Sequence, residues 1–402
     1  MDAEFHLPGV EALRREDMWG IIHDDNFKTA LLRGCAGSGK TTVAIYRLLR
    51  HTEQGNRVRL FTYQNMLVSY IKNLVVKKEK KLQLDDYITT FHFWYNQVDG
   101  YLNTNHPPSA SAILAALEKK VYKHNTVDEL LIDEGQDLPV EIFEALPNVF
   151  NRVIVSGDIA QNVQGYPPDH VDRIEETLKN NHMPFKPYTL GQNFRNTYET
   201  YYFARQFIPK TNREVWDPNI INRIKARGRR GRKPIVIPYT DSVVRDEHMR
   251  KVLLDARVGS VGILCPIGPK GKERYTGESV EGVYDLITSW GLPATKYYSG
   301  CDKPTVLKRY IVTTFKSSKG LEFDVVVIPR INFFRKPSDL PNSTIQEEMY
   351  VASTRARGQL YIYRDQVNIQ FDPIADFDPT TYESPHVQDS EISFNDVDDV
   401  PF

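Results

Sequence analysis

The chain contains a stretch whose residue types and spacing suit the binding of a phosphate chain. Residues 34–41 read Gly-Cys-Ala-Gly-Ser-Gly-Lys-Thr, which fits the pattern G-x-x-x-x-G-K-[ST]. The glycines let the backbone curl so that several N–H groups point inward, and the start of a following helix adds partial positive charge. Lys40 would reach the β- and γ-phosphates of a nucleoside triphosphate, and the Thr41 hydroxyl would hold Mg²⁺. The residues expected to bind the nucleotide here are Gly34, Ala36, Gly37, Ser38, Gly39, Lys40, Thr41 and Thr42.

Two adjacent acids supply the second half of such a site. The apolar run Leu130-Leu131-Ile132 leads directly into Asp133 and Glu134, which is typical of a buried strand with polar groups at its end. Asp133 would hold Mg²⁺ through water, and Glu134 would polarise the attacking water. The loop and the acids together predict hydrolysis of a nucleoside triphosphate.

Alternating strands and helices must position these residues. The phosphate loop lies between a buried strand at 30–33 and an amphipathic helix at 42–49. This alternation continues along the first half of the chain and implies a parallel, doubly wound sheet. A later set of strands indicates a second α/β domain. The expected strands are 30–33, 57–62, 87–90, 129–134, 152–158 and 188–190 in the first set, and 235–239, 261–265, 310–315, 324–328 and 359–363 in the second.

The elements divide the chain into three parts. Residues 1–200 are expected to form the first domain, with a small insertion near 93–128 that holds one helix, and residues 201–370 the second. A basic, glycine-rich segment at 223–233 reads as a loop near the domain boundary, where it either meets phosphates or is solvated. Residues 371–402 have little apolar periodicity and nine acids, so we expect a disordered acidic tail.

Composition places the chain among ordinary globular proteins. It has 402 residues, 41% of them hydrophobic and 26% charged, with three cysteines whose spacing suits neither a metal nor a disulfide framework. The start is acidic and lacks an apolar signal core, which favours a cytoplasmic location. Because the tail has no Lys or Arg, the rest of the chain holds 51 basic against 43 acidic residues (52 less nine), a balance compatible with a polyanion partner.

Read together and in order, the motifs resemble those of superfamily 1 helicases of the UvrD/Rep type over residues 30–365. They include the phosphate loop, a T-F-H segment, the box D-E-G-Q-D, the box G-D-I-A-Q and the sequence Q-N-F-R. Two long final segments, T-T-F-K-S-S-K-G-L-E-F and Y-V-A-S-T-R-A, are the most specific. The matching segments are residues 34–41, 61–65, 90–92, 133–137, 157–161, 192–195, 313–323 and 350–356.

The resemblance implies two RecA-like domains with ATP and Mg²⁺ in the cleft between them. Gln161 would sense the γ-phosphate, while Arg195 and Arg355 would reach the same phosphate and stabilise charge in the transition state. Glu322 would contact the ribose, and Gly320 would lie in the same nucleotide-binding segment. Because these groups come from both domains, ATP binding would close the cleft and its loss would open it.

The resemblance implies a track of single-stranded nucleic acid, with DNA favoured over RNA, and movement in the 3′ to 5′ direction; RNA stays open as the track. The resemblance maps backbone contacts onto five positions and leaves Trp94 and Tyr166 as candidates for base stacking, with core packing as the alternative. Whether the chain also unwinds duplex stays open. The positions expected to contact the backbone are Thr62, Asn65, His92, Thr314 and Lys316.

The chain departs from the family in three places. No glutamine stands in the stretch 13–19, where family members read adenine, so selectivity for that base is in doubt. Only 41 positions separate His92 from Asp133, and 118 separate Arg195 from Thr313, which leaves little room for the family's inserted subdomains. An ATP-gated clamp or partner-regulated switch that unwinds nothing is therefore the rival reading.

The third departure is the end of the sequence, Asp-Asp-Val-Pro-Phe at 398–402. It resembles the acidic tip of bacterial single-stranded-DNA-binding proteins, which dock a terminal phenylalanine on a protein partner. Three readings stay open: the tail folds back on a basic groove, it docks on such a partner, or it is an uninformative acidic stretch.

Overall fold

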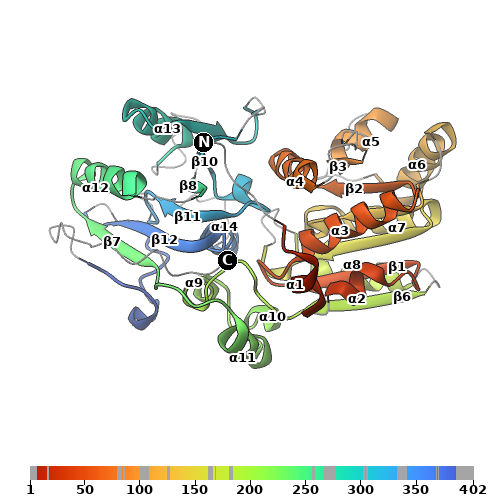
Figure 1. Cartoon of the computed structure of the whole chain (residues 1–402), viewed down its shortest axis with the longest axis horizontal. Coiled ribbons are helices and arrows are strands. Elements are labelled where there is room, and N and C mark those ends of the chain that lie inside the picture. Colours follow the sequence, from red (N-terminus) through yellow and green to blue (C-terminus); the bar gives the residue numbers. More distant parts are fainter. Residues whose placement is uncertain are drawn as a thin grey trace.

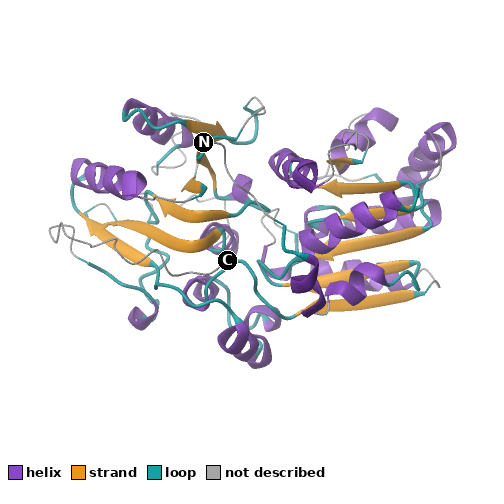
Figure 2. Cartoon of the chain, in the orientation of Figure 1, coloured by secondary structure: helices purple, strands orange, loops and turns teal. Residues whose placement is uncertain are grey.

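The computed structural model describes residues 7–15, 18–78, 84, 87–99, 108–124, 127–161, 166–167, 169–180, 184–255, 259–266, 278–301, 304, 307–332, 342–367, 369 and 371–385. These residues form two α/β units, each built on a six-stranded sheet with helices on both faces (Figure 2). All strand pairs in both sheets are parallel. The fold class expected from the alternation of strands and helices is confirmed.

The first sheet has the strand order β3-β2-β4-β5-β1-β6. The four inner strands, β2, β4, β5 and β1, form because short, largely apolar runs of four to six residues can be buried on both sides, as parallel sheets require. Side chains alternate between the two faces: Leu31 and Phe61 face one apolar cluster, while Ala30 and Leu60 face another. The strands are β1 (Thr29–Gly34), β2 (Val58–Thr62), β3 (Ile88–Thr90), β4 (Glu129–Ile132), β5 (Arg152–Gly157) and β6 (Phe185–Leu190).

Helices cover both faces of this sheet. Side chains of α3 and α4 pack on one face, and those of α5 to α8 pack on the other. The insertion near 93–128 contains α5 and α6, so it holds two helices where we expect one. The helices are α1 (Val10–Arg15), α2 (Met18–His23), α3 (Lys40–Glu53), α4 (Asn65–Lys78), α5 (Phe91–Asp99), α6 (Ala110–His124), α7 (Val140–Val149) and α8 (His170–Asn180).

The second sheet has the order β7-β12-β11-β8-β10-β9. One of its strands, β9 (Ala294–Tyr297), is missing from the sequence-based expectation, because only four residues pair there and they include Lys296. The other strands are β7 (Ile235–Tyr239), β8 (Val261–Cys265), β10 (Tyr310–Thr314), β11 (Phe323–Ile328) and β12 (Ala356–Asp365). The helices are α9 (Tyr198–Ala204), α10 (Arg213–Trp216), α11 (Pro218–Arg227), α12 (Ser242–Asp255), α13 (Val280–Ser289) and α14 (Asn342–Ser353).

The two units share a continuous apolar cluster that includes Leu67 of α4 and Phe315 and Leu321 of the second unit. Gly320 lies at this contact, with φ +81° and an ideal Cβ position 2.6 Å from the Leu67 side chain. Another residue would be strained by this φ, and the Leu67 side chain would have to move to accommodate its Cβ. In Figure 1 the two units lie side by side with α14 between them.

Two sequence-based expectations are wrong. Residues 371–385 are ordered: Ile374 is buried, and Phe377 and Tyr382 pack against Phe203 and Phe207. These aromatic contacts are not periodic, so their apolar surface escapes a search for amphipathic patterns. Residues 386–402 lie outside the described residues. The basic segment 223–233 is not entirely loop, since α11 extends to Arg227. Among the described residues, no helix is long and apolar enough to cross a membrane.

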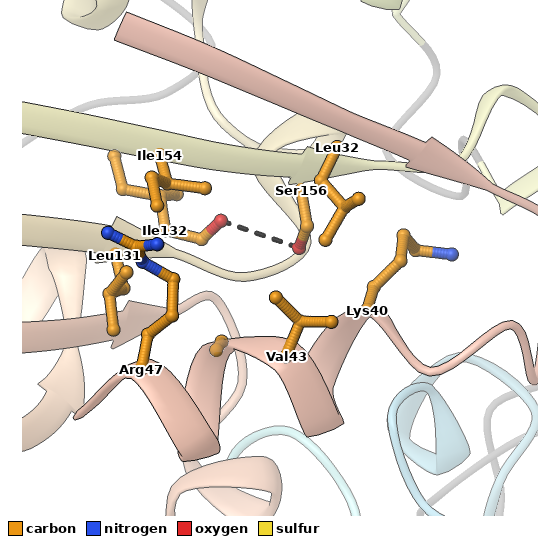
Figure 3. A pocket seen from close by; sticks show the side chains of 9 residues that line it. Leu32, Lys40, Val43, Arg47, Leu131, Ile132, Ile154 and Ser156 are labelled. Carbon is orange, nitrogen blue, oxygen red and sulfur yellow. Dashed lines mark hydrogen bonds between the residues drawn. The ribbon is translucent and has the colours of Figure 1, made fainter. Parts of the chain in front are cut away.

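A buried ion network fixes the amino-terminal side of the first sheet. The Arg47 guanidinium donates to both carboxylate oxygens of Glu129, at 2.8 and 2.9 Å, and neither side chain is exposed. It also donates to Asp25 at 2.9 Å and contacts His51 Nε2 at 3.2 Å. Asp25, His51 and Glu129 are close enough to resemble a metal site, but the guanidinium already occupies the space between them. Figure 3 shows Arg47 and Lys40 at opposite ends of a pocket that lies between α3 and the strands of the first sheet and is lined mainly by apolar side chains.

We predict that Arg47→Met lowers the free energy of unfolding by about 3–5 kcal/mol, because it keeps the aliphatic stem and leaves Glu129 buried with reduced compensation. Urea unfolding measures the loss. Arg50→Met, which removes a partly exposed partner of Asp25, is the matched control and should cost less than about 1 kcal/mol. Equal losses for the two variants would contradict the assignment of Arg47 as the structural cation.

Candidate nucleotide site and nucleic-acid interface

The phosphate loop runs from the end of β1 to the start of α3 with the geometry of an anion cradle. Gly37 and Gly39 have φ of +76° and +94°, which only glycine adopts without strain. The Ser38 hydroxyl is buried and has no hydrogen-bond partner among the described residues. A buried hydroxyl of this kind fits a ligand with acceptor oxygens. The Lys40 ammonium lies inside the loop, where it donates to the carbonyls of Gly34 (2.6 Å) and Cys35 (3.1 Å).

The oxygen ligands expected for Mg²⁺ lie together beside the loop. Thr41 donates to Asp133 at 2.6 Å, and Ser156 donates to the other oxygen of the same carboxylate. Burial and the neighbouring charge of Glu134 raise the pKa of Asp133, so a cation at this position would stabilise its ionised form. A hydroxyl and a carboxylate are hard oxygen donors of the kind that Mg²⁺ prefers. The residues present therefore fit the ion.

Glu134 occupies an unusual backbone conformation, with φ 58° and ψ 44°, and is the non-glycine residue with positive φ in the described chain. Such strain is concentrated at functional sites. Gln136 donates to its carboxylate at 2.6 Å and accepts from the Asp158 N–H. Burial opposes ionisation of Glu134, but the charges of Lys319, Lys40 and Arg355 outweigh it and keep its pKa below the ordinary value. The carboxylate is therefore poised to accept a proton or orient water.

The cations predicted to reach the γ-phosphate converge on this place from both domains. Arg355, at the end of α14, is completely buried and donates to the Gln161 side chain at 3.1 Å. Burial and the nearby Arg195 lower its pKa to about 9, although the charges of Glu134 and Asp158 oppose the shift. Arg195 forms an ion pair with Glu322 at 3.0 Å. The arrangement suits an anion bound between Gln161, Arg195 and Arg355.

Glu322 and Gly320, which are predicted to lie in the nucleotide-binding segment, contact protein groups in the structure. Glu322 contacts Arg195 and lies 3.7 Å from Arg357, so its carboxylate sits at the cleft and holds two arginines. Gly320 packs against α4 as described above. Both residues border the predicted nucleotide cleft. The contact of Glu322 with ribose stays a prediction.

Sequence reasoning missed Lys319, whose ammonium reaches across the domain interface. It lies 2.8 Å from both oxygens of Asp137, 2.7 Å from the Gln161 carbonyl and 3.5 Å from Glu134. Burial raises the pKa of Asp137 to about 6 despite this lysine. Lys319 and Asp137 both lie inside the recognised motifs, but the sequence does not indicate that their charged groups are in contact. Lys319 directly joins the second domain to the acidic side of the catalytic cleft.

The predicted nucleic-acid positions gather at the carboxyl ends of β2, β3 and β10. Asn65, His92, Thr314 and Lys316 are partly exposed there. Gln64 donates to the Lys316 carbonyl at 2.8 Å, which joins the two domains at this edge. Thr62 is fully buried, and its hydroxyl has no hydrogen-bond partner among the described residues.

The stacking candidates have different surroundings. Trp94 is only 7% exposed and packs against Phe61, Phe91 and Phe150, so the proposal that it stacks on bases is wrong in this conformation. The helix α5 turns residues 91, 94 and 95 inward and leaves Phe93 55% exposed. Tyr166 stacks on His170, with ring centroids 4.1 Å apart.

Comparison with known proteins agrees with the geometry. Residues 21–167 match a family described as an AAA domain, and residues 283–366 match the UvrD-like helicase C-terminal domain. A 51-residue stretch is 49% identical to the RecBCD enzyme subunit RecB of Chlamydia pneumoniae. That stretch covers 13% of this chain and 5% of RecB, so the chain spans a small part of this relative.

A solved structure supports the two-domain fold. Dbp5 of S. cerevisiae, bound to RNA and ADP BeF3, matches with a TM-score of 0.51 over 93% of this chain and 90% of that chain. The sequences are 10% identical, so the likeness concerns the fold alone. The two matched domains and the stretch shared with RecB support the recognition of the chain as similar to superfamily 1 helicases of the UvrD/Rep type.

Proposed function

We propose that the protein is a nucleic-acid-stimulated ATPase that translocates on single-stranded DNA in the 3′ to 5′ direction. The observation that carries the proposal is the convergence of groups from both domains on one cleft. Lys40, Glu134 and Gln161 come from the first domain, while Arg355 and Lys319 come from the second. A site divided in this way makes hydrolysis depend on how the domains are placed.

Each residue has a distinct task in this proposal. Lys40 and the loop amides bind the phosphates, and Thr41 and Asp133 hold Mg²⁺, which neutralises phosphate charge when bound. Glu134 orients the attacking water and accepts its proton. Arg195 and Arg355 stabilise the charge that develops on the γ-phosphoryl group. The buried surroundings strengthen these interactions because little water screens them.

The nucleic-acid edge lies close to the catalytic groups along the chain. Lys316 and Lys319 belong to one short turn, and the carbonyl of Lys316 accepts from Gln64 of the first domain. A nucleic-acid strand bound by Thr314 and Lys316 would therefore influence the position of Lys319. A shift of Lys319 would in turn change the charge around Glu134. This gives a physical route by which DNA binding stimulates hydrolysis.

An ATP-gated clamp that moves or holds a strand without separating duplex is the second candidate. One observation favours it: in the described residues, α5 and α6 are the helices between β3 and β4. Large inserted subdomains, which the family resemblance leads one to expect, have no counterpart in this part of the fold. The clamp predicts DNA-stimulated hydrolysis but no strand displacement.

One paired experiment decides between the two. ATP turnover is measured with and without single-stranded DNA, with an RNA of the same sequence as the comparison, and strand displacement is measured on duplexes with 3′ or 5′ tails. Stimulation by DNA with displacement from a 3′ tail supports the helicase. Stimulation without displacement supports the clamp, and an absence of hydrolysis contradicts both.

We predict that Glu134→Gln keeps ATP binding but lowers turnover by about 10²–10⁴-fold, the usual contribution of a general base. Lys40→Ala should instead weaken binding as well as hydrolysis. A filter-binding assay and steady-state kinetics separate the two effects. Normal turnover in Glu134→Gln would remove this residue from the role of base.

We predict that Lys319→Met moves the acid limb of the pH–rate profile to higher pH. Lys319 lowers the pKa of Glu134, so its loss raises that pKa, and a higher pH is then needed to ionise the base. Lys308→Met, an exposed lysine at the start of β10, is the matched control and should leave the profile in place. A uniform fall in rate without a shift would contradict an electrostatic role for Lys319.

We predict weak discrimination between ATP and GTP. The adenine-reading glutamine is missing, and Met18 and Phe194 lie against Gly39 of the phosphate loop. Apolar contacts of this kind would hold either purine alike. Competition binding with the two nucleotides measures the preference. An ATP preference above about 100-fold would show that hydrogen bonds read the base.

A protein partner remains part of the proposal only through the Asp-Asp-Val-Pro-Phe sequence at 398–402, which lies outside the described residues. Deleting Phe402 would remove an apolar anchor without changing the charge of the acidic side chains. Loss of a partner upon this deletion, with unchanged DNA binding, would support such docking.

A further inference from the structure

One segment of the surface has a strong excess of positive charge. Residues 223–233 contain seven Lys and Arg and no acid. The segment covers the end of α11, at the bottom of Figure 1, and the chain that leads into β7. The described side chains with high exposure are Arg223, Lys225, Arg230 and Lys233.

Part of this charge stays exposed to solvent. Arg230 pairs with Glu199 at 3.2 Å, and its side chain is still 57% exposed. Burial and the neighbouring charge of Arg357 lower the pKa of Arg229, as expected where cations crowd together. The segment therefore favours an anionic occupant.

The described chain ends beside this segment. Glu383 donates its N–H to the Pro234 carbonyl at 2.9 Å and accepts from the Val236 N–H at 2.7 Å. It thus lies alongside the residue that follows Lys233. Hydrogen bonds from Thr380 chiefly lower the pKa of Asp378, and Lys233 adds to the effect. Residues 371–385 already bring acids next to the basic segment.

The next 17 residues, 386–402, have the opposite charge, with five acids and no Lys or Arg. At about 3.3 Å per extended residue they reach roughly 55 Å, whereas the ten residues of α11 span only about 15 Å. The stretch therefore begins beside the basic segment, is long enough to lie along it and carries the opposite charge. Its acids are Asp389, Glu391, Asp396, Asp398 and Asp399.

We propose that residues 386–402 bind the basic segment 223–233 of the same chain. Each exposed ion pair contributes less than about 1 kcal/mol, so the contact depends on several pairs and weakens as salt screens them. Exposed lysines and arginines also attract nucleic-acid phosphates, so the bound tail would compete with any nucleic acid that extends from the β2, β3 and β10 edge to this segment. This property is separate from ATP hydrolysis.

Carbodiimide cross-linking tests the contact directly in the full chain, because it joins a lysine amine to a carboxylate without a spacer. At low salt, mass spectrometry should find Lys225 or Lys233 joined to acids between 389 and 399. These links should disappear near 1 M salt, where the screening length falls to about 3 Å. Links to Lys316 instead, or no links at all, would overturn the proposal.

Binding of single-stranded DNA then tests the competition. Replacing the five tail acids by their amides should tighten DNA binding about tenfold at low salt, and adding Arg223→Gln, Lys225→Gln and Lys233→Gln should cancel the gain. Arg250→Gln with Lys251→Gln, exposed cations of α12, is the control and should preserve it. The proposal is overturned if the tighter DNA binding persists after the Arg223, Lys225 and Lys233 replacements. It is also overturned if loss of the five acids leaves DNA binding unchanged.

A further outcome would assign the segment to nucleic acid rather than to the tail. In that case the Arg223, Lys225 and Lys233 replacements weaken DNA binding while the amide substitutions have no effect, and cross-links to the tail are absent. Because cross-linking needs no ATP, its failure is distinguishable from failure of the proposed ATPase.

Discussion

Lys319 crosses the domain interface and places its ammonium 2.8 Å from both carboxylate oxygens of Asp137. Both groups are buried, and removing a charge from water is costly unless a partner compensates it. The pairing therefore restricts the relative position of the two domains much more sharply than apolar packing alone. The same lysine lies 3.5 Å from Glu134, so the contact that positions the domains also sets the charge around the carboxylate that we propose as the general base.

The cleft brings three cations close together. Burial and the nearby Arg195 lower the pKa of Arg355 to about 9, while Lys40 donates to backbone carbonyls of its own loop and lies 3.5 Å from Asp158. A triphosphate would satisfy all three cations and the unpartnered hydroxyl of Ser38. Ligand binding and domain placement are consequently coupled through electrostatics.

Local patterns predict much of this structure. The phosphate loop, the strand that ends at Asp133 and the parallel sheets follow from residues close together in sequence. The Lys319–Asp137 pair does not, because 182 residues separate its members and only the placement of two domains brings them together. Trp94 could have been predicted as buried, since residues 91, 94 and 95 share one face of a helix. The order of residues 371–385 depends on Phe203 and Phe207, and no local signal indicates that contact.

In the proposed mechanism, hydrolysis needs cations from the second domain in a site built mainly by the first. The turnover of Arg355→Ala at saturating ATP and single-stranded DNA tests this dependence, with nucleotide affinity measured in parallel. Loss of one such preorganised group typically lowers kcat by about 10²–10³-fold, and we expect that loss with ATP still bound. Turnover equal to that of the unaltered protein would contradict a catalytic site shared between the domains.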